Sequence, residues 1–142
     1  MKASKVKQRI LDYLSARPDE NAFIRSEFNA LSQSRSGVDK AIRVLVSEGV
    51  LVRGGYGVLV RGEFIPEIQS AAPLVWPEIF AKEALVKLGI DPKPNSAVVE
   101  YNSGRTTQVP AWLAFDVGNS RIVRKIGFGK RLVNYERERK VE

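Results

Sequence analysis

The sequence contains no cysteine and no histidine among its 142 residues. Without cysteine a disulfide framework is excluded, and without either residue the usual ligands of protein-bound zinc are missing. Neither a Cys–His pair nor a Ser–His–Asp triad can be assembled, so two common nucleophile systems are excluded as well. We therefore expect a protein that is not an enzyme and that holds no metal and no cofactor.

Long hydrophobic runs are absent too. No stretch of about 18 apolar residues occurs, so no membrane span is predicted. The first eight residues form a basic helical pattern without the apolar core of a signal peptide. These features predict a cytoplasmic protein with no membrane partner. With 44% hydrophobic residues, a chain of this length buries roughly two-thirds of its unfolded surface, as one domain or two small modules.

The charge is positive and unevenly distributed. The chain has 23 Lys and Arg against 16 Asp and Glu, a net charge of +7. Residues 1–64 carry 11 basic against 7 acidic side chains, residues 65–100 carry 3 against 5, and residues 101–142 carry 9 against 4. A positive excess favours an anionic partner such as nucleic acid. Ordinary solvent-exposed surface charge also explains such a pattern. A sequence motif is therefore needed to decide between an anionic partner and simple surface charge.

The first 63 residues alternate helical and strand patterns. Val6, Ile10, Tyr13 and Leu14 recur with the spacing of one helix face. The expected elements, in order, are a helix over 4–16, an extended piece at 23–24, helical turns over 26–31, a turn at 32–34, a helix over 34–47 and a hairpin over 50–61 whose turn is Gly54-Gly55-Tyr56-Gly57. In the third helix, Ser36 and Asp39 resemble a capping box, and Gly49 ends it. This order is that of a winged helix-turn-helix.

In a winged helix the third helix enters the DNA major groove by its N-terminal end. Arg35 lies in the first turn, where its guanidinium can bind guanine O6 and N7, whereas Lys40 and Arg43 are better placed for phosphates. The full set of expected DNA contacts is Ser34, Arg35, Ser36, Lys40, Arg43, Arg53, Tyr56 and Arg61. The alternative is that these are solvated charges on a helix that contacts protein. We favour DNA because the element order and the charge agree.

The remaining sequence predicts a linker and a second module. Residues 64–75 contain two prolines and no clear period. Trp76-Pro77 begins a fourth helix that ends before Gly89, and Trp76 is interpreted as a core anchor. From residue 97 onward, short strand-like runs predict an antiparallel sheet. The expected architecture is α+β: a winged helix at 1–63, a linker at 64–75, and one helix plus a short antiparallel β-sheet at 76–142.

Two features of the C-terminal half are candidate recognition surfaces. The polar run at 102–110 combines hydroxyls, an amide and an arginine, although composition alone favours a loop. Basic and apolar residues alternate over 121–126, and more cations follow across a turn at 127–129, so one face of such a ribbon is expected to be positive. The candidate residues are Arg105, Thr106, Thr107, Gln108, Arg121, Arg124, Lys125, Lys130 and Arg131.

Two parts of the sequence resemble the AbiEi-type antitoxins. The helix containing Val38-Asp39-Lys40-Ala41-Ile42-Arg43-Val44-Leu45, followed by Gly49-Val50-Leu51 and the Gly55-Tyr56-Gly57 wing, is similar to the N-terminal domain of that family. The element Thr107-Gln108-Val109-Pro110 looks like the Ser/Thr-Thr-Gln-Val-Pro element that follows the helix in these proteins. The winged helix is shared by many regulators, whereas the second element is the more specific of the two.

The resemblance implies the antitoxin of a type IV toxin-antitoxin system that represses its own operon. Its partners would be double-stranded DNA at promoter repeats and a nucleotidyltransferase-like toxin, which the C-terminal domain counteracts without a tight complex. We expect a monomer or a weak homodimer. Three other functions stay open: a plain winged-helix regulator, a protein-interaction adaptor, and, least favoured, an enzyme acting on nucleic acid through carboxylates such as Glu100 or Asp116.

Overall fold

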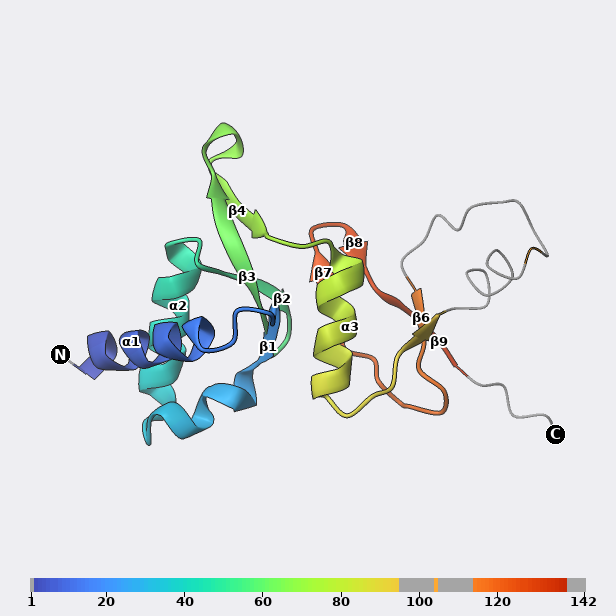
Figure 1. Cartoon of the computed structure of the whole chain (residues 1–142), viewed down its shortest axis with the longest axis horizontal. Coiled ribbons are helices and arrows are strands. Elements are labelled where there is room, and N and C mark those ends of the chain that lie inside the picture. The colour runs from blue at the N-terminus through green and yellow to red at the C-terminus, as the bar shows by residue number, and fades with distance from the viewer. Residues whose placement is uncertain (1, 95–103, 105–113, 138–142) are drawn as a thin grey trace.

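The structure, a computed structural model, describes residues 2–94, 104 and 114–137, and it has a mixed α+β architecture (Figure 1). The first half contains α1 (Lys2–Ser15), β1 (Ala22–Ile24), the 3-10 helix η1 (Arg25–Leu31), α2 (Arg35–Ser47), β2 (Leu51–Gly55) and β3 (Val58–Ile65). The second half contains η2 (Pro66–Ile68), β4 (Ser70–Pro73), α3 (Pro77–Lys87), β5 (Lys93–Pro94), β6 (Ala114–Asp116), β7 (Gly127–Phe128), β8 (Arg131–Leu132) and β9 (Asn134–Glu136). Among the helices described, none has the length and apolar character to cross a membrane.

An antiparallel sheet in the order β1-β3-β2 divides the molecule into two packed layers. One face is covered by α1, η1 and α2 (Figure 1). The predicted apolar stripe of α1 is confirmed, because Val6, Ile10 and Leu14 are buried against this face, with Tyr13 only half-buried at the edge. The cluster consists of Val6, Ile10, Leu14, Phe23, Phe28, Val38, Ala41, Ile42, Leu45, Leu51 and Leu59.

The ends of α2 are set by Ser34 and Gly49. The Ser34 hydroxyl accepts a hydrogen bond from the Gly37 amide at 3.0 Å, which satisfies one of the free N–H groups of the first turn. The capping box expected at Ser36 and Asp39 is therefore wrong, since the cap lies two residues earlier. Gly49 has a φ of 78° and follows the last turn, as the sequence predicts. The helix thus begins with Arg35 and Ser36 in its first, exposed turn.

The opposite face of the same sheet is covered by α3. Phe80, Ala81, Ala84 and Leu85 are buried against side chains of β1 and β3. Ile126 and Val133, from the last third of the chain, complete this second cluster. The two halves therefore share a core through the sheet, whereas the sequence predicts separate modules joined by a linker.

Residues 64–75 form a projecting arm instead of a linker. β3 continues past the sheet to Ile65, η2 turns the chain, and β4 returns antiparallel to β3, with Phe64 opposite Ala71. The arm extends away from the helices at the top of Figure 1. No period is visible in this sequence because neither face of the arm is buried: Glu63, Phe64 and Ile68 are all exposed.

The C-terminal strands form two small sheets, one of which is only partly antiparallel. β5 and β6 pair antiparallel, as do β7 and β8, but β6 and β9 run parallel. No strand occurs at 121–125, where basic and apolar residues alternate. Ile122 and Ile126 instead anchor an irregular segment in the second core cluster. The part of the expected sheet that falls within 97–103 and 105–113 lies outside the described residues.

Trp76 is not a core anchor. Its side chain is 68% exposed, because Trp76 precedes the first turn of α3 and the buried positions of that turn are taken by Pro77 and Phe80. The interpretation of Trp76 from the sequence is therefore wrong, and a large aromatic side chain is left on the surface.

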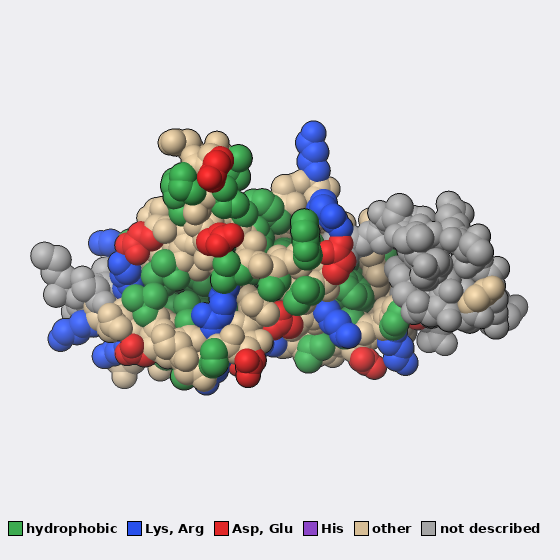
Figure 2. Space-filling model, turned by 45° about the horizontal axis from the view of Figure 1, so that its top comes forward, with side chains coloured by type: hydrophobic (Ala, Val, Ile, Leu, Met, Phe, Trp, Pro, Cys, Tyr) green, Lys and Arg blue, Asp and Glu red, His purple; other side chains and the backbone are tan. Residues whose placement is uncertain are grey.

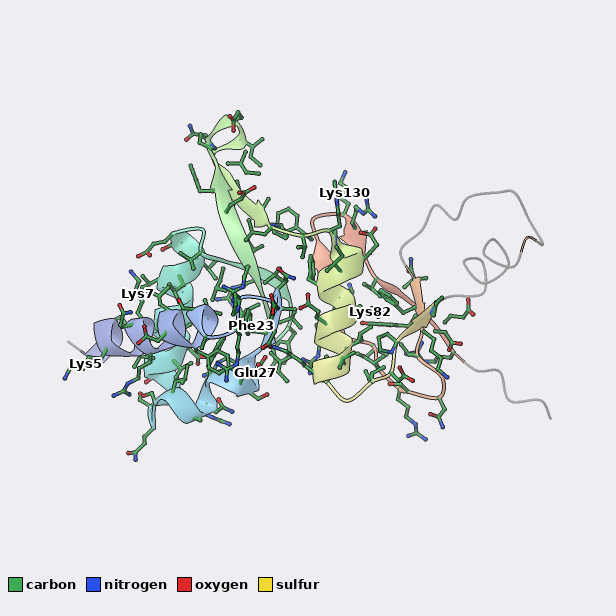
Figure 3. The ribbon with its side chains drawn as sticks, in the orientation of Figure 1. Lys5, Lys7, Phe23, Glu27, Lys82 and Lys130 are labelled. Carbon is green, nitrogen blue, oxygen red and sulfur yellow. The ribbon has the colours of Figure 1, made fainter. Side chains whose placement is uncertain are left out.

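An ionic cluster ties the end of α3 to the first helices. The Lys87 ammonium lies 3.0 Å from both carboxylate oxygens of Glu27 and 4.4 Å from the centroid of the Phe23 ring. The Tyr13 hydroxyl donates to Glu27 Oε1 at 2.7 Å, and the Ile24 amide donates to Glu27 Oε2 at 2.7 Å. Figure 3 shows Glu27 and Phe23 on the side of the first helices that faces α3. This cluster fixes α3 against the N-terminal half.

The cluster makes stability depend on pH in the alkaline range. Burial, and next the hydrogen bond to Glu27, raise the pKa of Tyr13 from 10.0 to about 12. Above pH 10 the phenol ionises in the unfolded chain but not in the folded one, so the stability contributed by Tyr13 is complete below pH 10 and is lost as the pH rises to 12. We expect urea unfolding to show a steeper loss of stability between pH 10 and 12 for the wild type than for Tyr13→Phe. Parallel curves would contradict this assignment.

Candidate nucleic-acid interface

The outward face of α2 carries three exposed cations. Because Val38, Ala41, Ile42 and Leu45 face the core, the opposite side of this helix is exposed to solvent. Within the described residues, the exposed side chains of Arg35, Lys40 and Arg43 make no hydrogen bond or ion pair. Ser34 and Ser36 are exposed beside them, although their hydroxyls lie 3.1 Å apart and Ser34 also caps the helix. The surface predicted from the sequence is therefore accessible.

The one carboxylate on this face is neutralised by a residue of η1. Arg25 Nε donates to Asp39 Oδ1 at 2.9 Å. The same guanidinium donates to Asn29 Oδ1 at 2.7 Å. Sequence reasoning missed Arg25 and Asn29 as members of this surface. The available signal was Asp39 itself, because an acidic residue on a cationic face requires a counter-charge if that face is to bind an anion.

The β2–β3 turn lies beside the first turn of α2. The Arg25 amide donates to the Gly57 carbonyl at 2.8 Å, which holds the turn next to η1. Tyr56 stands at the tip and is 85% exposed. Arg124, from the C-terminal half, donates from Nη1 to the Tyr56 carbonyl at 3.0 Å, and its guanidinium carbon lies 5.6 Å from the centroid of the Tyr56 ring. A C-terminal arginine therefore braces the tip of the hairpin.

A groove of about 900 Å³ runs between α2, the hairpin and the β7–β8 turn. It is lined by Arg43 of α2, Arg53 of β2 and Lys125 of the irregular segment before β7, and each is exposed and has no ion-pair partner among the described residues. Its floor at Gly55 is close to the C-terminal half, since a Cβ atom there would lie 2.2 Å from the Lys125 carbonyl oxygen. Glycine is therefore required at 55. The groove combines three cations with closely approaching backbone, an arrangement suited to binding the phosphate backbone of a nucleic acid.

Arg61 does not belong to this surface. Its guanidinium donates to the carbonyls of Leu14 at 2.5 Å, Arg17 at 2.6 Å and Glu20 at 2.6 Å. These carbonyls lie at and just beyond the end of α1, and two of them also accept from backbone amides, Leu14 from Arg17 at 3.1 Å and Arg17 from Glu20 at 3.1 Å. The guanidinium predicted to contact DNA is thus held by three carbonyls within the fold, where it caps the end of α1 from β3.

The predicted C-terminal cationic ribbon is also wrong. Its residues are dispersed: Arg124 contacts the hairpin tip, Lys125 lines the groove, and Arg131 pairs with Glu78 of α3. Lys130 is exposed in the turn after β7, and Arg121 is exposed on the irregular segment. The remaining candidates lie outside the described residues: Arg105, Thr106, Thr107 and Gln108.

In the described ranges, no group of three or more acidic side chains is arranged to hold a metal ion. No family model matches this chain, and no curated protein matches its sequence. The properties of the groove and of α2 are therefore the basis for assigning a function.

Proposed function

We propose that this chain is a DNA-binding transcriptional repressor whose first 63 residues form a winged helix-turn-helix. The order α1, β1, η1, α2, β2, β3 with an antiparallel β1-β3-β2 sheet is the arrangement that such a domain requires. The observation that carries the proposal is the face of α2: three exposed cations that have no partner among the residues the structure describes, next to an exposed hairpin tip.

In the proposed complex, the N-terminal turn of α2 lies in the major groove. Arg35 then reads a guanine edge, since a guanidinium can donate to O6 and N7 together. Lys40, Arg43, Arg53 and Lys125 bind phosphates on either side, and the Tyr56 tip contacts the adjacent backbone. Each phosphate contact releases condensed counterions, so the affinity falls steeply with salt.

The proposal is tested by titrating the full chain into a labelled duplex from the DNA upstream of its own gene, with a scrambled duplex as the control. We expect tighter binding to the upstream duplex and a log–log salt slope of about −3 to −5, for about four to five phosphate contacts. Equal affinity for both duplexes would overturn a sequence-specific repressor. A shallow slope would overturn the phosphate contacts.

We further propose that the C-terminal half makes this chain the antitoxin of a type IV system, on the basis of the family resemblance of its sequence. The adjacent gene should then encode a nucleotidyltransferase-like toxin, whose expression alone stops growth. Co-expression of this chain should restore growth without a complex that survives size-exclusion chromatography. An adjacent gene of another kind, or growth arrest that this chain does not relieve, would leave a plain regulator.

The brace from Arg124 predicts a coupling between the C-terminal half and DNA binding. We expect Arg124→Ala and Tyr56→Ala each to weaken binding to the upstream duplex about 3- to 10-fold, and the double variant to be no weaker than the worse single one, because both changes free the same tip. Arg121→Ala is the matched control and should bind like the wild type. Fully additive losses would show that Arg124 acts independently of the tip.

A further inference from the structure

We propose that the projecting arm and the surface beside it form a homodimer interface. We define the apolar face by five large side chains that are exposed on the arm, at the start of α3 and on β7. These are Phe64, Ile68, Leu74, Trp76 and Phe128. Soluble monomers rarely expose several large apolar groups together unless the surface binds a partner.

Four of the five side chains, all but Ile68, line two adjoining hollows. One, of about 440 Å³, lies between the arm and β2 and is lined by Phe64 and Phe128. The other, of about 410 Å³, is lined by Leu74, Trp76 and the same Phe128. Phe128 therefore connects the two hollows into one continuous surface. Hydrophobic side chains on the arm stand out at the upper left of Figure 2.

The backbone of the arm also lacks partners. Beyond Gly62, β3 pairs only with β4, and β4 pairs only with β3, in the part of the chain that the structure describes. A two-stranded hairpin is only marginally stable in water, and both of its edges offer unpaired N–H and C=O groups to another strand. A second chain that paired with one edge would satisfy these groups and cover the aromatic side chains.

The area and the charges favour a second copy as the occupant. With each side chain about half exposed, the apolar face offers roughly 500 Å² per copy, and two copies bury about 1,000 Å², the lower limit for a specific interface. The arm carries exposed Glu63 and Glu67, whereas the neighbouring β7–β8 turn carries exposed Lys130, which points away from the molecule in Figure 3. A two-fold interface must be self-complementary, and a surface with an acidic and a basic end meets that condition.

The partner is unlike the one at the groove. Acidic side chains on the arm repel DNA and anionic lipid, and the arm lies at the opposite end of β3 from the Tyr56 tip. A dimer formed here meets α2 only at Val46 and Ser47, which line the hollow beside the arm, so the faces that carry Arg35 and Lys40 stay free in both copies. The interface does not depend on whether those faces bind DNA, so its test is made without DNA.

Sedimentation velocity of the full chain over a range of concentrations tests the interface. We expect the mass to rise from 15.8 kDa toward twice that value in the micromolar to millimolar range. Trp76→Ser together with Phe64→Ser should weaken dimerisation at least 10-fold, while Val123→Ser, at an exposed valine outside the face, should not. Circular dichroism checks that each variant is folded. A wild type that stays at 15.8 kDa throughout, or a dimer that the double variant leaves intact, would overturn the proposal.

The lack of cysteine provides a second test that does not depend on removing side chains. Ile68→Cys and Ala72→Cys place single thiols on the arm, and Ser15→Cys places one at the exposed end of α1. Mild oxidation should convert at least one arm variant to a disulfide-linked dimer much faster than the α1 variant. Equal rates of disulfide formation in the arm and α1 variants would show that the arm does not bind a second copy. The same conclusion would follow if the chain stayed monomeric by itself and its arm bound the product of the adjacent gene tightly.

Discussion

Replacing Arg61 by methionine is expected to lower the free energy of unfolding by about 2–4 kcal/mol, because three carbonyl groups lose a charged donor at once. The guanidinium of Arg61 donates to the carbonyls of Leu14, Arg17 and Glu20. Methionine keeps the apolar part of the side chain but removes the guanidinium from all three carbonyls, and only those of Leu14 and Arg17 keep a backbone donor, the amides of Arg17 and Glu20. A cation at the end of a helix also interacts favourably with the helix dipole, and that contribution is lost too.

Arg53→Met is the matched control, since Arg53 lies on the neighbouring strand of the same hairpin. Its side chain is exposed and has no ion-pair partner among the described residues, so we expect a change of less than about 0.5 kcal/mol. Urea unfolding followed by circular dichroism measures both. The DNA affinities should show the reverse order: a loss for Arg53→Met and none for folded Arg61→Met. Equal stabilities of the two variants would contradict the capping role.

Removal of the three α2 cations is expected to abolish specific DNA binding while leaving the fold intact. In the variant with Arg35→Ala, Lys40→Ala and Arg43→Ala, we expect the affinity for the upstream duplex to fall about 100- to 1,000-fold at moderate salt, and the log–log salt slope to become shallower by about 2. Stability should change little, because none of the three side chains has a partner within the described part of the molecule.

Loss of net charge alone would also weaken DNA binding, so the control removes the same charge elsewhere. Lys82, Lys93 and Arg121 are exposed and lie in the second half of the chain. Their joint replacement by alanine should weaken binding less than about 10-fold and should act equally on the upstream and scrambled duplexes. Equivalent losses in the two triple variants would mean that α2 has no special role.

Elements with a strong local period could be predicted from the sequence. The stripe of Val38, Ala41, Ile42 and Leu45 specifies which face of α2 is buried, and so also which residues are exposed. The glycines at 54, 55 and 57 indicated the hairpin turn, and Gly49 indicated the end of α2. In these segments the local preference and the tertiary packing agree, so the exposed cations of α2 could be named in advance.

The difference between Arg53 and Arg61 could not be predicted, because both follow β-branched runs at equivalent places of the hairpin. Their roles depend on what lies across the sheet: the end of α1 stands beside Arg61, whereas Arg53 faces the groove. Such information is in the packing of distant segments and not in the local pattern. The same reason applies to Arg25, whose partner Asp39 is 14 residues away, and to Arg124, whose partner Tyr56 is 68 residues away.

The predictions for the arm and for Trp76 were wrong for another reason. Sequence patterns reveal a strand through the alternation of one buried and one exposed face. The arm buries neither face in the single chain, so its residues show no alternation and were interpreted as a linker. If two copies pair there, the faces of the arm are buried only in the dimer, so the exposed apolar residues of the arm belong to an interface that a single chain does not contain. Trp76 belongs to the same surface, and its exposure then has a physical reason.

The proposed role of α2 is tested most directly by nuclear magnetic resonance of the ¹⁵N-labelled chain during titration with the upstream duplex. The backbone amides report which face meets the DNA, residue by residue, without any substitution. We expect the largest shifts at 34–43 and at 55–57, with smaller ones at 125–129 and none on the arm at 64–74. Shifts confined to the arm or to α3, with α2 unchanged at saturating DNA, would contradict the proposed function.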